Sequence, residues 1–312
     1  MRRVIITGPT GAIGVALINE CITHDVEVIA VVRPGSKRKG NIPKAGLVRI
    51  VECDLSELTK LPELIKEHVD VFYHMGWDGT FGNSRNNMQG QLLNVQYTLD
   101  AVQVAKRLGC KRFVGTGSQA EYGRCEEKLN ADTPAFPENG YGIAKLCAGQ
   151  MSRIMCEQNG MEHIWTRILS IYGPYDGENT MIMSTIKTLL RGEKPSTTPG
   201  EQQWDYLYAK DAGLALYLLG DAGVSGKIYC IGSGETRQLK EYVMAIRDYI
   251  EQLKEVKLPL GIGEREYADK QVMYLCADIT ELKKDTGFAP RYSFEHGIAE
   301  TVTWVKAKNE ED

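Results

Sequence analysis

The chain has 312 residues, of which 43% are hydrophobic and 25% charged, and its formal net charge is -4 at pH 7. This composition is typical of a globular protein with room for one large domain or two smaller ones, and without a long basic run it argues against nucleic acid as a partner. Eight cysteines show no CxxC or His/Cys ligand spacing, which argues against a disulfide framework or a metal site. The chain opens directly into a strand-like run and no apolar stretch approaches 18 residues, so we expect a cytoplasmic protein that does not contact a membrane.

Short β-rich runs alternate with longer helical stretches over the first 170 residues. Strand character is found at residues 4–7, 26–32, 48–53, 69–74, 112–116 and 163–169. Helical spacing is found at residues 12–21, 61–67, 89–108 and 141–159. This alternation predicts a parallel sheet covered by helices on both faces, the doubly wound α/β arrangement of the Rossmann fold.

The alternation loosens after residue 170, where glycines and prolines break the chain into short elements. We expect residues 171–202 and 234–312 to form a smaller substrate-binding lobe beside a main domain of residues 1–170. A short strand and helix within 204–220 and a strand at 227–231 predict that residues 203–233 rejoin the main domain.

A glycine turn, TGPTGAIG at residues 7–14, joins the first predicted strand to the first predicted helix. Gly8 permits a tight turn, Gly11 lets the backbone approach a pyrophosphate, and Gly14 allows close helix packing. A turn needed only for packing is the alternative, but the strand-turn-helix context favours a dinucleotide. The expected contacts in this turn are Gly8, Thr10, Gly11, Ala12, Ile13 and Gly14.

The identity of the dinucleotide is indicated by the end of the second predicted strand. An NAD site usually has a carboxylate there, whereas this chain has Arg33, which favours NADP over NAD. The residues expected to bind the 2′-phosphate are Arg33, Ser36, Lys37 and Arg38, although a solvated basic loop explains them too. Further expected cofactor contacts are Asp54 and Leu55 after the third strand, Met75, Gly76 and Trp77 after the fourth, and Ile168 in the sixth. Asp54 also suits a helix N-cap, and Trp77 also suits the core.

The pentapeptide YGIAK at residues 141–145 has the spacing of a proton-transfer site. Tyr141 and Lys145 are four residues apart and share one helix face. A neighbouring cation stabilises a phenolate, so we expect Lys145 to lower the pKa of Tyr141 toward the range of a general acid or base. Such pairs also occur on solvated helices, but Ser118, at the end of the fifth strand, adds a hydroxyl from a second element.

Taken together, TGxxGxxG, Ser118 before YG, YxxxK and the later WDYLYAKD resemble the extended short-chain dehydrogenase/reductase family, in its NAD-dependent epimerase/dehydratase (nucleotide-sugar) branch. The resemblance covers nearly the whole chain. It implies that Tyr141 transfers a proton, that Ser118 hydrogen-bonds the substrate oxygen, and that Lys145 holds the nicotinamide ribose and tunes Tyr141. It also implies a homodimer through the helices at 91–107 and 142–158, although their apolar spacing equally suits packing on the sheet.

The residues beside Ser118 narrow the chemistry that the resemblance implies. Related 4,6-dehydratases carry an Asp-Glu pair directly after the aligned Ser or Thr, and enzymes that combine 3,5-epimerisation with reduction carry a Cys two positions after it. This chain has Gln119 and Ala120 there. Gln119 is expected to contact the substrate, as is Trp204, although relatives often carry at the latter position an Arg that binds the substrate diphosphate.

Two reactions need no further acid-base pair: reduction of a 4-keto sugar nucleotide, and C4 epimerisation through a transient ketone. The basic loop favours an NADPH-dependent reductase of a 4-keto-6-deoxyhexose nucleotide, with an NAD-dependent C4 epimerase as the alternative. A reductase of an aromatic or aliphatic aldehyde and a non-catalytic dinucleotide sensor are the other possibilities. Sensors of that kind tend to lose YxxxK, which is intact here.

Overall fold

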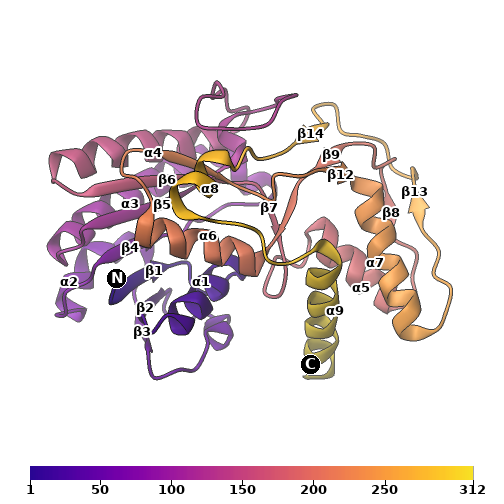
Figure 1. Ribbon diagram of the computed structural model, residues 1–312, viewed down its shortest axis with the longest axis horizontal. Coiled ribbons are helices and arrows are strands. Elements are labelled where there is room, and N and C mark those ends of the chain that lie inside the picture. Colours follow the sequence, from indigo (N-terminus) through magenta and orange to yellow (C-terminus); the bar gives the residue numbers. More distant parts are fainter. Residues whose placement is uncertain (312) are drawn as a thin grey trace.

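The computed structural model describes residues 1–311, and its largest element is a sheet of seven parallel strands (Figure 1). In spatial order the strands are β11 (Ile228–Ile231), β6 (Glu162–Ile168), β5 (Arg112–Ser118), β4 (Val71–His74), β1 (Arg3–Thr7), β2 (Glu27–Val32) and β3 (Val48–Glu52). The order reverses between β1 and β4, as it does in doubly wound folds. The predicted fold class is confirmed.

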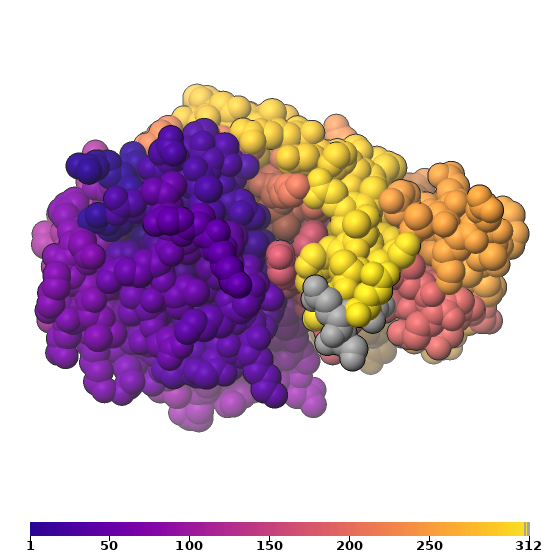
Figure 2. Space-filling model, turned by 90° about the horizontal axis from the view of Figure 1, so that it is seen from below, coloured from indigo at the N-terminus to yellow at the C-terminus, as the bar shows by residue number. Residues whose placement is uncertain are grey.

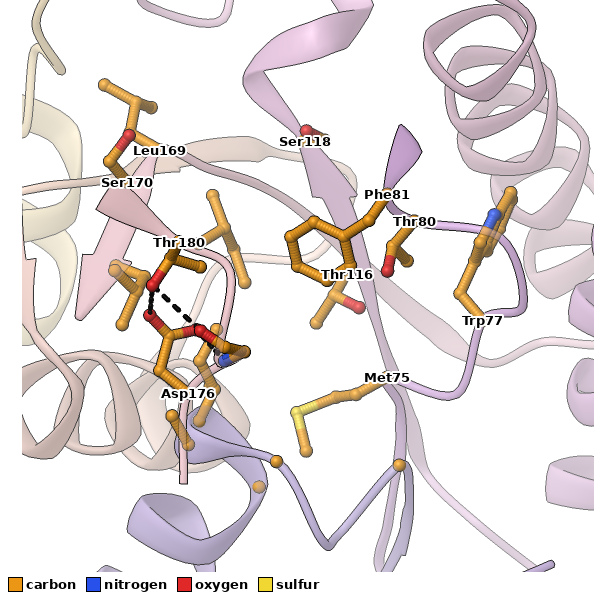
Figure 3. Close-up of a pocket in the computed structure, with 18 of the residues that line it drawn as sticks. Met75, Trp77, Thr80, Phe81, Thr116, Ser118, Leu169, Ser170, Asp176 and Thr180 are labelled. Carbon is orange, nitrogen blue, oxygen red and sulfur yellow. Dashed lines mark hydrogen bonds between the residues drawn. The ribbon is translucent and has the colours of Figure 1, made fainter. Parts of the chain in front are cut away.

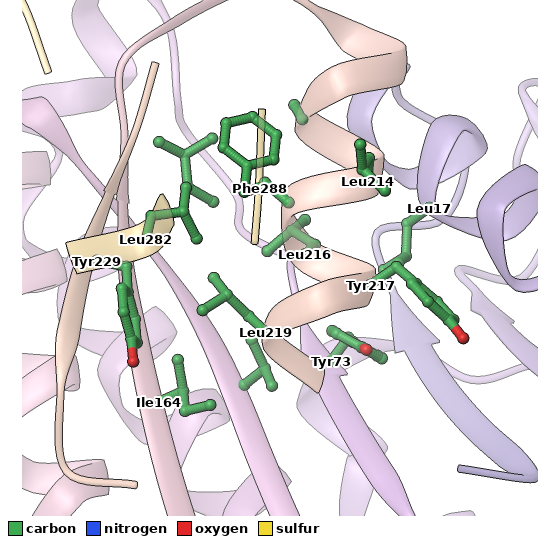
Figure 4. Close-up of a cluster of buried hydrophobic side chains, with 14 of the residues drawn as sticks. Leu17, Tyr73, Ile164, Leu214, Leu216, Tyr217, Leu219, Tyr229, Leu282 and Phe288 are labelled. Carbon is green, nitrogen blue, oxygen red and sulfur yellow. The ribbon is translucent and has the colours of Figure 1, made fainter. Parts of the chain in front are cut away.

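Helices cover both faces of the sheet because its strands carry apolar residues on both sides. Val4 and Ile6 of β1 belong to one cluster with residues of α1 (Ala12–Thr23) and α6 (Ala209–Ala222). Figure 4 shows Leu17 of α1 and Leu216 of α6 in this cluster. Ile5 faces the opposite side, which is covered by α2 (Leu61–Leu64), α3 (Met88–Arg107) and α4 (Gly140–Gln158). Neighbouring residues of one strand therefore belong to different cores.

A smaller lobe lies beside the carboxyl ends of the strands (Figure 1). In Figure 2 most of its orange and yellow residues lie to one side of the indigo and purple main domain, and part of the yellow segment extends over that domain. Its core lies among α5 (Met181–Leu190), α7 (Leu239–Lys254) and α9 (Phe294–Glu311). The short strands of this lobe and of its junction with the main domain are β7 (Ser170–Tyr172), β8 (Ser196–Thr197), β9 (Gln203–Trp204), β10 (Tyr206–Tyr208), β12 (Arg237–Gln238), β13 (Gly261–Ile262) and β14 (Tyr274–Leu275), and α8 (Thr280–Thr286) lies near β11.

The pairing of β11 with β6 and the packing of α6 on α1 return the chain to the main domain after residue 203. We propose on this basis the division into residues 1–170 with 203–233, and 171–202 with 234–312. Asp312 lies outside the described residues.

Most predicted boundaries differ from the observed ones by one to three residues, and two of the differences are informative. The helix predicted at 61–67 ends at Leu64, and Ile65 is extended because its buried side chain turns into the core on the way to β4. Strand β5 runs two residues further than predicted, so that Ser118 is its last residue. Within residues 1–311 we find no helix with the length and apolar character needed to span a bilayer.

Candidate active site

A cavity of about 460 Å³ lies at the carboxyl ends of β1, β4, β5 and β6, where the lobe meets the sheet (Figure 3). Ligands bind at this edge in open α/β sheets, at the point where the strand order reverses. The predicted site residues that line it are Gly8, Gly11, Ala12, Ile13, Gly14, Arg38, Met75, Trp77, Ser118, Tyr141, Lys145 and Ile168.

Ser118 and Tyr141 approach each other because of a glycine. The Ser118 hydroxyl oxygen accepts a hydrogen bond from the backbone N–H of Ala120 at 3.2 Å, which leaves its O–H free to donate. Tyr141 is the second residue of α4, and a Cβ atom on Gly142 would lie 2.2 Å from the backbone oxygen of Ala120. The glycine of YGIAK therefore lets α4 come close to the end of β5, a role that we did not predict.

Lys145 is buried against the floor of the cavity. Its Nζ donates to the backbone oxygen of Thr116 at 2.6 Å and lies 3.8 Å from the centre of the Trp77 ring. The indole of Trp77 is itself held by Gln91, which accepts a hydrogen bond from Nε1 at 2.9 Å. Burial lowers the pKa of Lys145 to about 7, against the opposing charge of Glu121.

The pKa of Tyr141 is raised, whereas we predicted that it would be lowered. Burial raises it, and the hydrogen bond with Ser118 and the positive charge of Arg85 only partly offset that effect. The prediction that Lys145 would lower this pKa is wrong. The Lys145 ammonium lies 5.9 Å from the centre of the phenol ring, whereas the guanidinium carbon of Arg85 lies 4.8 Å from it.

The glycine turn has the geometry of a phosphate site. Gly8 has φ +70°, a left-handed conformation that glycine adopts without strain. Gly11, the N-cap of α1, has no side-chain cap, no acidic residue follows in the first turn, and a Cβ atom at Gly11 would meet nothing within 4 Å. The free N–H groups of this helix end thus face an open space that fits a pyrophosphate.

The predicted basic loop contributes one side chain to the cavity. Arg38 lines it and donates from Nη2 to the backbone oxygen of Tyr175 at 2.6 Å. Arg33 and Lys37 are exposed, and neither has a carboxylate partner within residues 1–311. Lys39, in contrast, pairs with Glu52 at 2.7 Å. Arg38 is therefore the cation of this loop that lines the cavity, and Arg33 and Lys37 stay exposed without a carboxylate partner among the described residues.

Several predicted contacts lie outside the cavity. Asp54 acts as an N-cap and accepts a hydrogen bond from the backbone N–H of Ser56 at 3.0 Å. Trp204 donates from Nε1 to the Ser170 hydroxyl at 2.8 Å and lines a second cavity of about 580 Å³, which shares Tyr206 with the first. The complete set of predicted residues that do not line the first cavity is Thr10, Arg33, Ser36, Lys37, Asp54, Leu55, Gly76, Gln119 and Trp204.

Sequence reasoning missed several of the residues that line the cavities. The first cavity is lined by Thr80 and Phe81 after β4, by Ser170 of β7, and by Asp176 and Thr180 after β7, and the second is lined by Arg265 after β13. Asp176 accepts hydrogen bonds from Thr180 at 2.9 Å and from the backbone of Gly177 at 2.7 Å, and burial raises its pKa. These loops have no periodic pattern, and the only available signal was the polar run GPYDGENT after β7.

Glu121 lies below Ser118, sealed from the cavity. Its fully buried carboxylate accepts hydrogen bonds from the backbone N–H of Ser118 at 2.9 Å, from Trp165 Nε1 at 3.1 Å and from Arg167 Nε at 2.8 Å. It does not line the cavity, and so no carboxylate from the residues directly after Ser118 reaches it.

Comparison with known proteins adds three findings. Residues 4–232 match the model of the NAD dependent epimerase/dehydratase family. The dTDP-glucose 4,6-dehydratase of Neisseria meningitidis is 24% identical over 336 residues, which cover 97% of this chain and 93% of that protein. Among solved structures, the UDP-N-acetylglucosamine 4-epimerase of Methanobrevibacter ruminantium in complex with UDP-N-acetylmuramic acid superposes with a TM-score of 0.87 at 21% identity, over 98% of this chain and 99% of that chain. The UDP-glucuronic acid 4-epimerase of Bacillus cereus in complex with NAD superposes with a TM-score of 0.83 at 18% identity, over 98% of this chain and 99% of that chain.

Proposed function

The chain belongs to the NAD dependent epimerase/dehydratase family, and we propose that within it the protein is an NADPH-dependent reductase of a 4-keto-6-deoxyhexose nucleotide. The observation that carries this proposal is the set of acid-base groups beside Ser118. Tyr141 and Lys145 line the cavity there, while Glu121 is sealed in an ion pair. Asp176 belongs to the loop after β7 and lies away from Ser118 (Figure 3). Elimination of water needs a second acid-base pair, and one proton transfer does not.

In the proposed mechanism Ser118, Tyr141 and Lys145 each have one role. Ser118 donates a hydrogen bond to the carbonyl oxygen of the substrate, and Tyr141 gives that oxygen a proton as negative charge develops on it. NADPH, when bound, supplies the hydride that reduces the carbonyl carbon. The glycine turn and the free end of α1 would hold its pyrophosphate, and Lys145 would hold its nicotinamide ribose.

The charges around the cavity favour a sugar without a carboxylate. Of the described side chains that line it, only Lys145 and Arg38 are cationic, and we assign both to the cofactor. A uronic acid would bury its carboxylate here without an ion partner, at a considerable desolvation cost. Phe81 and Leu169 instead offer an apolar wall that suits the methyl group of a 6-deoxy sugar.

The second cavity is our candidate for the nucleotide part of the substrate. It adjoins the first at Tyr206, and Arg265 is the one charged side chain among those that line it. A diphosphate needs positive charge, and Arg265 would supply it where relatives use an Arg at the position of Trp204.

The test of this function is the absorbance at 340 nm with NADPH, and then with NADH, over a panel of 4-keto sugar nucleotides. We expect oxidation of NADPH with at least one 4-keto-6-deoxyhexose nucleotide. The second candidate is an NAD-dependent C4 epimerase, favoured by the two structural neighbours that are named 4-epimerases. Interconversion of C4 epimers without added cofactor, and no oxidation of NADPH, would show that the reductase assignment is wrong.

The cofactor preference can be tested at the two arginines that we assign to the 2′-phosphate. The double substitution Arg33→Asp and Arg38→Ser should weaken NADPH binding by about 10- to 100-fold, because two charge-assisted hydrogen bonds are lost, while NADH binding should improve. Dissociation constants from quenching of tryptophan fluorescence would measure both. Lys44→Ser, a change at an exposed lysine of the same connection, is the control and should alter neither constant. Equal losses for NADPH and NADH would contradict a 2′-phosphate site.

We further propose that the protein is a homodimer through α3 and α4. Met88 and Leu92 on α3 and Ile143, Met151 and Ile154 on α4 are each 45–63% exposed. The two helices pack against each other, and the Met88 sulfur would lie 2.8 Å from a Cβ atom on Gly140. An exposed apolar surface of this extent marks an interface, and a second copy of the same two helices would cover it.

This interface predicts an effect on assembly. Leu92→Asp with Met151→Asp should turn the dimer into a monomer in sedimentation velocity, because four carboxylates would be buried across the two-fold axis. Met244→Asp, at an exposed methionine of α7, should leave the sedimentation coefficient unchanged. A dimer that survives the double substitution would exclude this face.

A further inference from the structure

An arginine that the family pattern does not account for, Arg85, lies over the ring of Tyr141. Arg85 belongs to the 3₁₀ turn η3 (Gly82–Asn86), and its guanidinium carbon lies 4.8 Å from the centre of the phenol ring. The turn is tied to the start of α4, since the Asn86 side chain accepts a hydrogen bond from the backbone N–H of Gly140 at 3.0 Å. It is also tied to α3, where the buried Gln91 donates to the backbone oxygen of Ser84 at 3.1 Å. Two anchors therefore hold the backbone beside Arg85 in place.

No acid neutralises Arg85. It is half-buried, and within residues 1–311 it makes no ion pair within 4.0 Å. A guanidinium carries a positive charge at every pH at which an enzyme works. Arg85 therefore places a positive charge beside the phenol ring of Tyr141. Lys145 is different, because it has a pKa of about 7 and its ammonium is turned onto Trp77 and the backbone of Thr116.

The other groups that face Tyr141 do not replace this charge. Ser118, at the end of β5, offers a neutral hydroxyl, and Trp77 presents its ring at 88° to the phenol, with 6.1 Å between the ring centres. Glu121 opposes a phenolate, but its ion pair with Arg167 reduces that effect. Within residues 1–311, Arg85 and Lys145 are thus the two cations that face Tyr141, and Arg85 is the nearer one.

We propose that Arg85 is a positioning residue for proton transfer, whose guanidinium stabilises the phenolate that forms when Tyr141 gives up its proton. The direction of the transfer, from the phenol O–H to the carbonyl oxygen as hydride reduces the carbon, rests on the proposed function. The charge effect itself does not, because it depends on the distance between the Arg85 guanidinium and the phenol ring. A cation near a phenol lowers its pKa, so loss of Arg85 must raise the pKa of Tyr141 above the value that burial already gives it.

The test titrates Tyr141 directly in protein labelled with ¹³C at the ζ carbon of tyrosine, with the Tyr141 signal assigned by its loss in Tyr141→Phe. We expect Arg85→Met to raise the pKa of Tyr141 by about one unit, and Arg85→Lys to restore most of the difference. Arg107→Met, at an exposed arginine of α3, should have no effect. An unchanged Tyr141 pKa in a folded Arg85→Met variant would overturn the proposal.

Kinetics separate this role from substrate binding. Arg85→Met should lower kcat about three- to tenfold with KM unchanged, and should shift the alkaline limb of the pH profile upward with the Tyr141 pKa. A change confined to KM would instead make Arg85 a substrate ligand and overturn the proposal. If no 4-keto nucleotide oxidises NADPH, the proposed function fails, yet a shifted Tyr141 titration would still support the role of Arg85.

Discussion

Replacing Tyr141 by phenylalanine should lower kcat by about 10²- to 10⁴-fold, the usual contribution of a positioned general acid. Tyr141 is the phenol that lies against Ser118. Among the described residues, Asp176 has the one carboxylate that lines the cavity, and it is occupied by hydrogen bonds within its own loop. The phenylalanine ring keeps the contacts with Trp77 and Arg85, so the substitution removes only the hydroxyl group that carries the proton. The loss should therefore appear in kcat, with dinucleotide binding unchanged.

Single-turnover oxidation of NADPH and equilibrium binding of NADPH would measure the two effects separately. Tyr97→Phe, at a half-exposed tyrosine of α3 outside both cavities, is the matched control and should keep wild-type turnover. Turnover within about tenfold of wild type for Tyr141→Phe would mean that another group donates the proton, and Asp176→Asn would then be the next variant to examine.

The sequence predicted those parts of the site that depend on short-range spacing. Tyr141 and Lys145 share a helix face because four residues make about one turn, and the glycine turn follows directly from the first strand. The sheet was predictable because its strands are continuous apolar runs, which a parallel sheet covered on both faces requires.

The parts that could not be predicted depend on contacts between distant segments. Arg85 lies in a loop without periodicity and reaches Tyr141 only because Asn86 binds the start of α4. The pKa of Tyr141 was predicted in the wrong direction because spacing shows which charges are near, but not how much water folding removes. Glu121 and Arg167 are 46 residues apart, and nothing in either local sequence indicates their pairing.

The buried ion pair between Glu121 and Arg167 gives the second large expected effect, which is on stability. Glu121→Ala should lower the free energy of unfolding by about 3–5 kcal/mol, the usual cost of leaving one member of a buried ion pair without its partner. Arg167 is 3% exposed and its Nη1 already has no hydrogen-bond partner, so loss of the carboxylate would leave a guanidinium with little to compensate its charge. The backbone N–H of Ser118 and the Trp165 indole would lose their acceptor as well.

Urea denaturation followed by circular dichroism would measure this loss, with two controls. Glu138→Ala breaks the exposed pair with Arg124, in which two nitrogens donate at 2.7 and 2.9 Å, and should cost far less because water solvates both charges. The double substitution Glu121→Leu with Arg167→Met removes both charges together and should recover most of the stability lost in Glu121→Ala. If the double variant is as unstable as Glu121→Ala, the loss of stability is due to packing around Ser118 and not to the unpaired charge. Recovery of stability without recovery of turnover would instead show that the carboxylate of Glu121 is retained to hold Ser118 beside Tyr141.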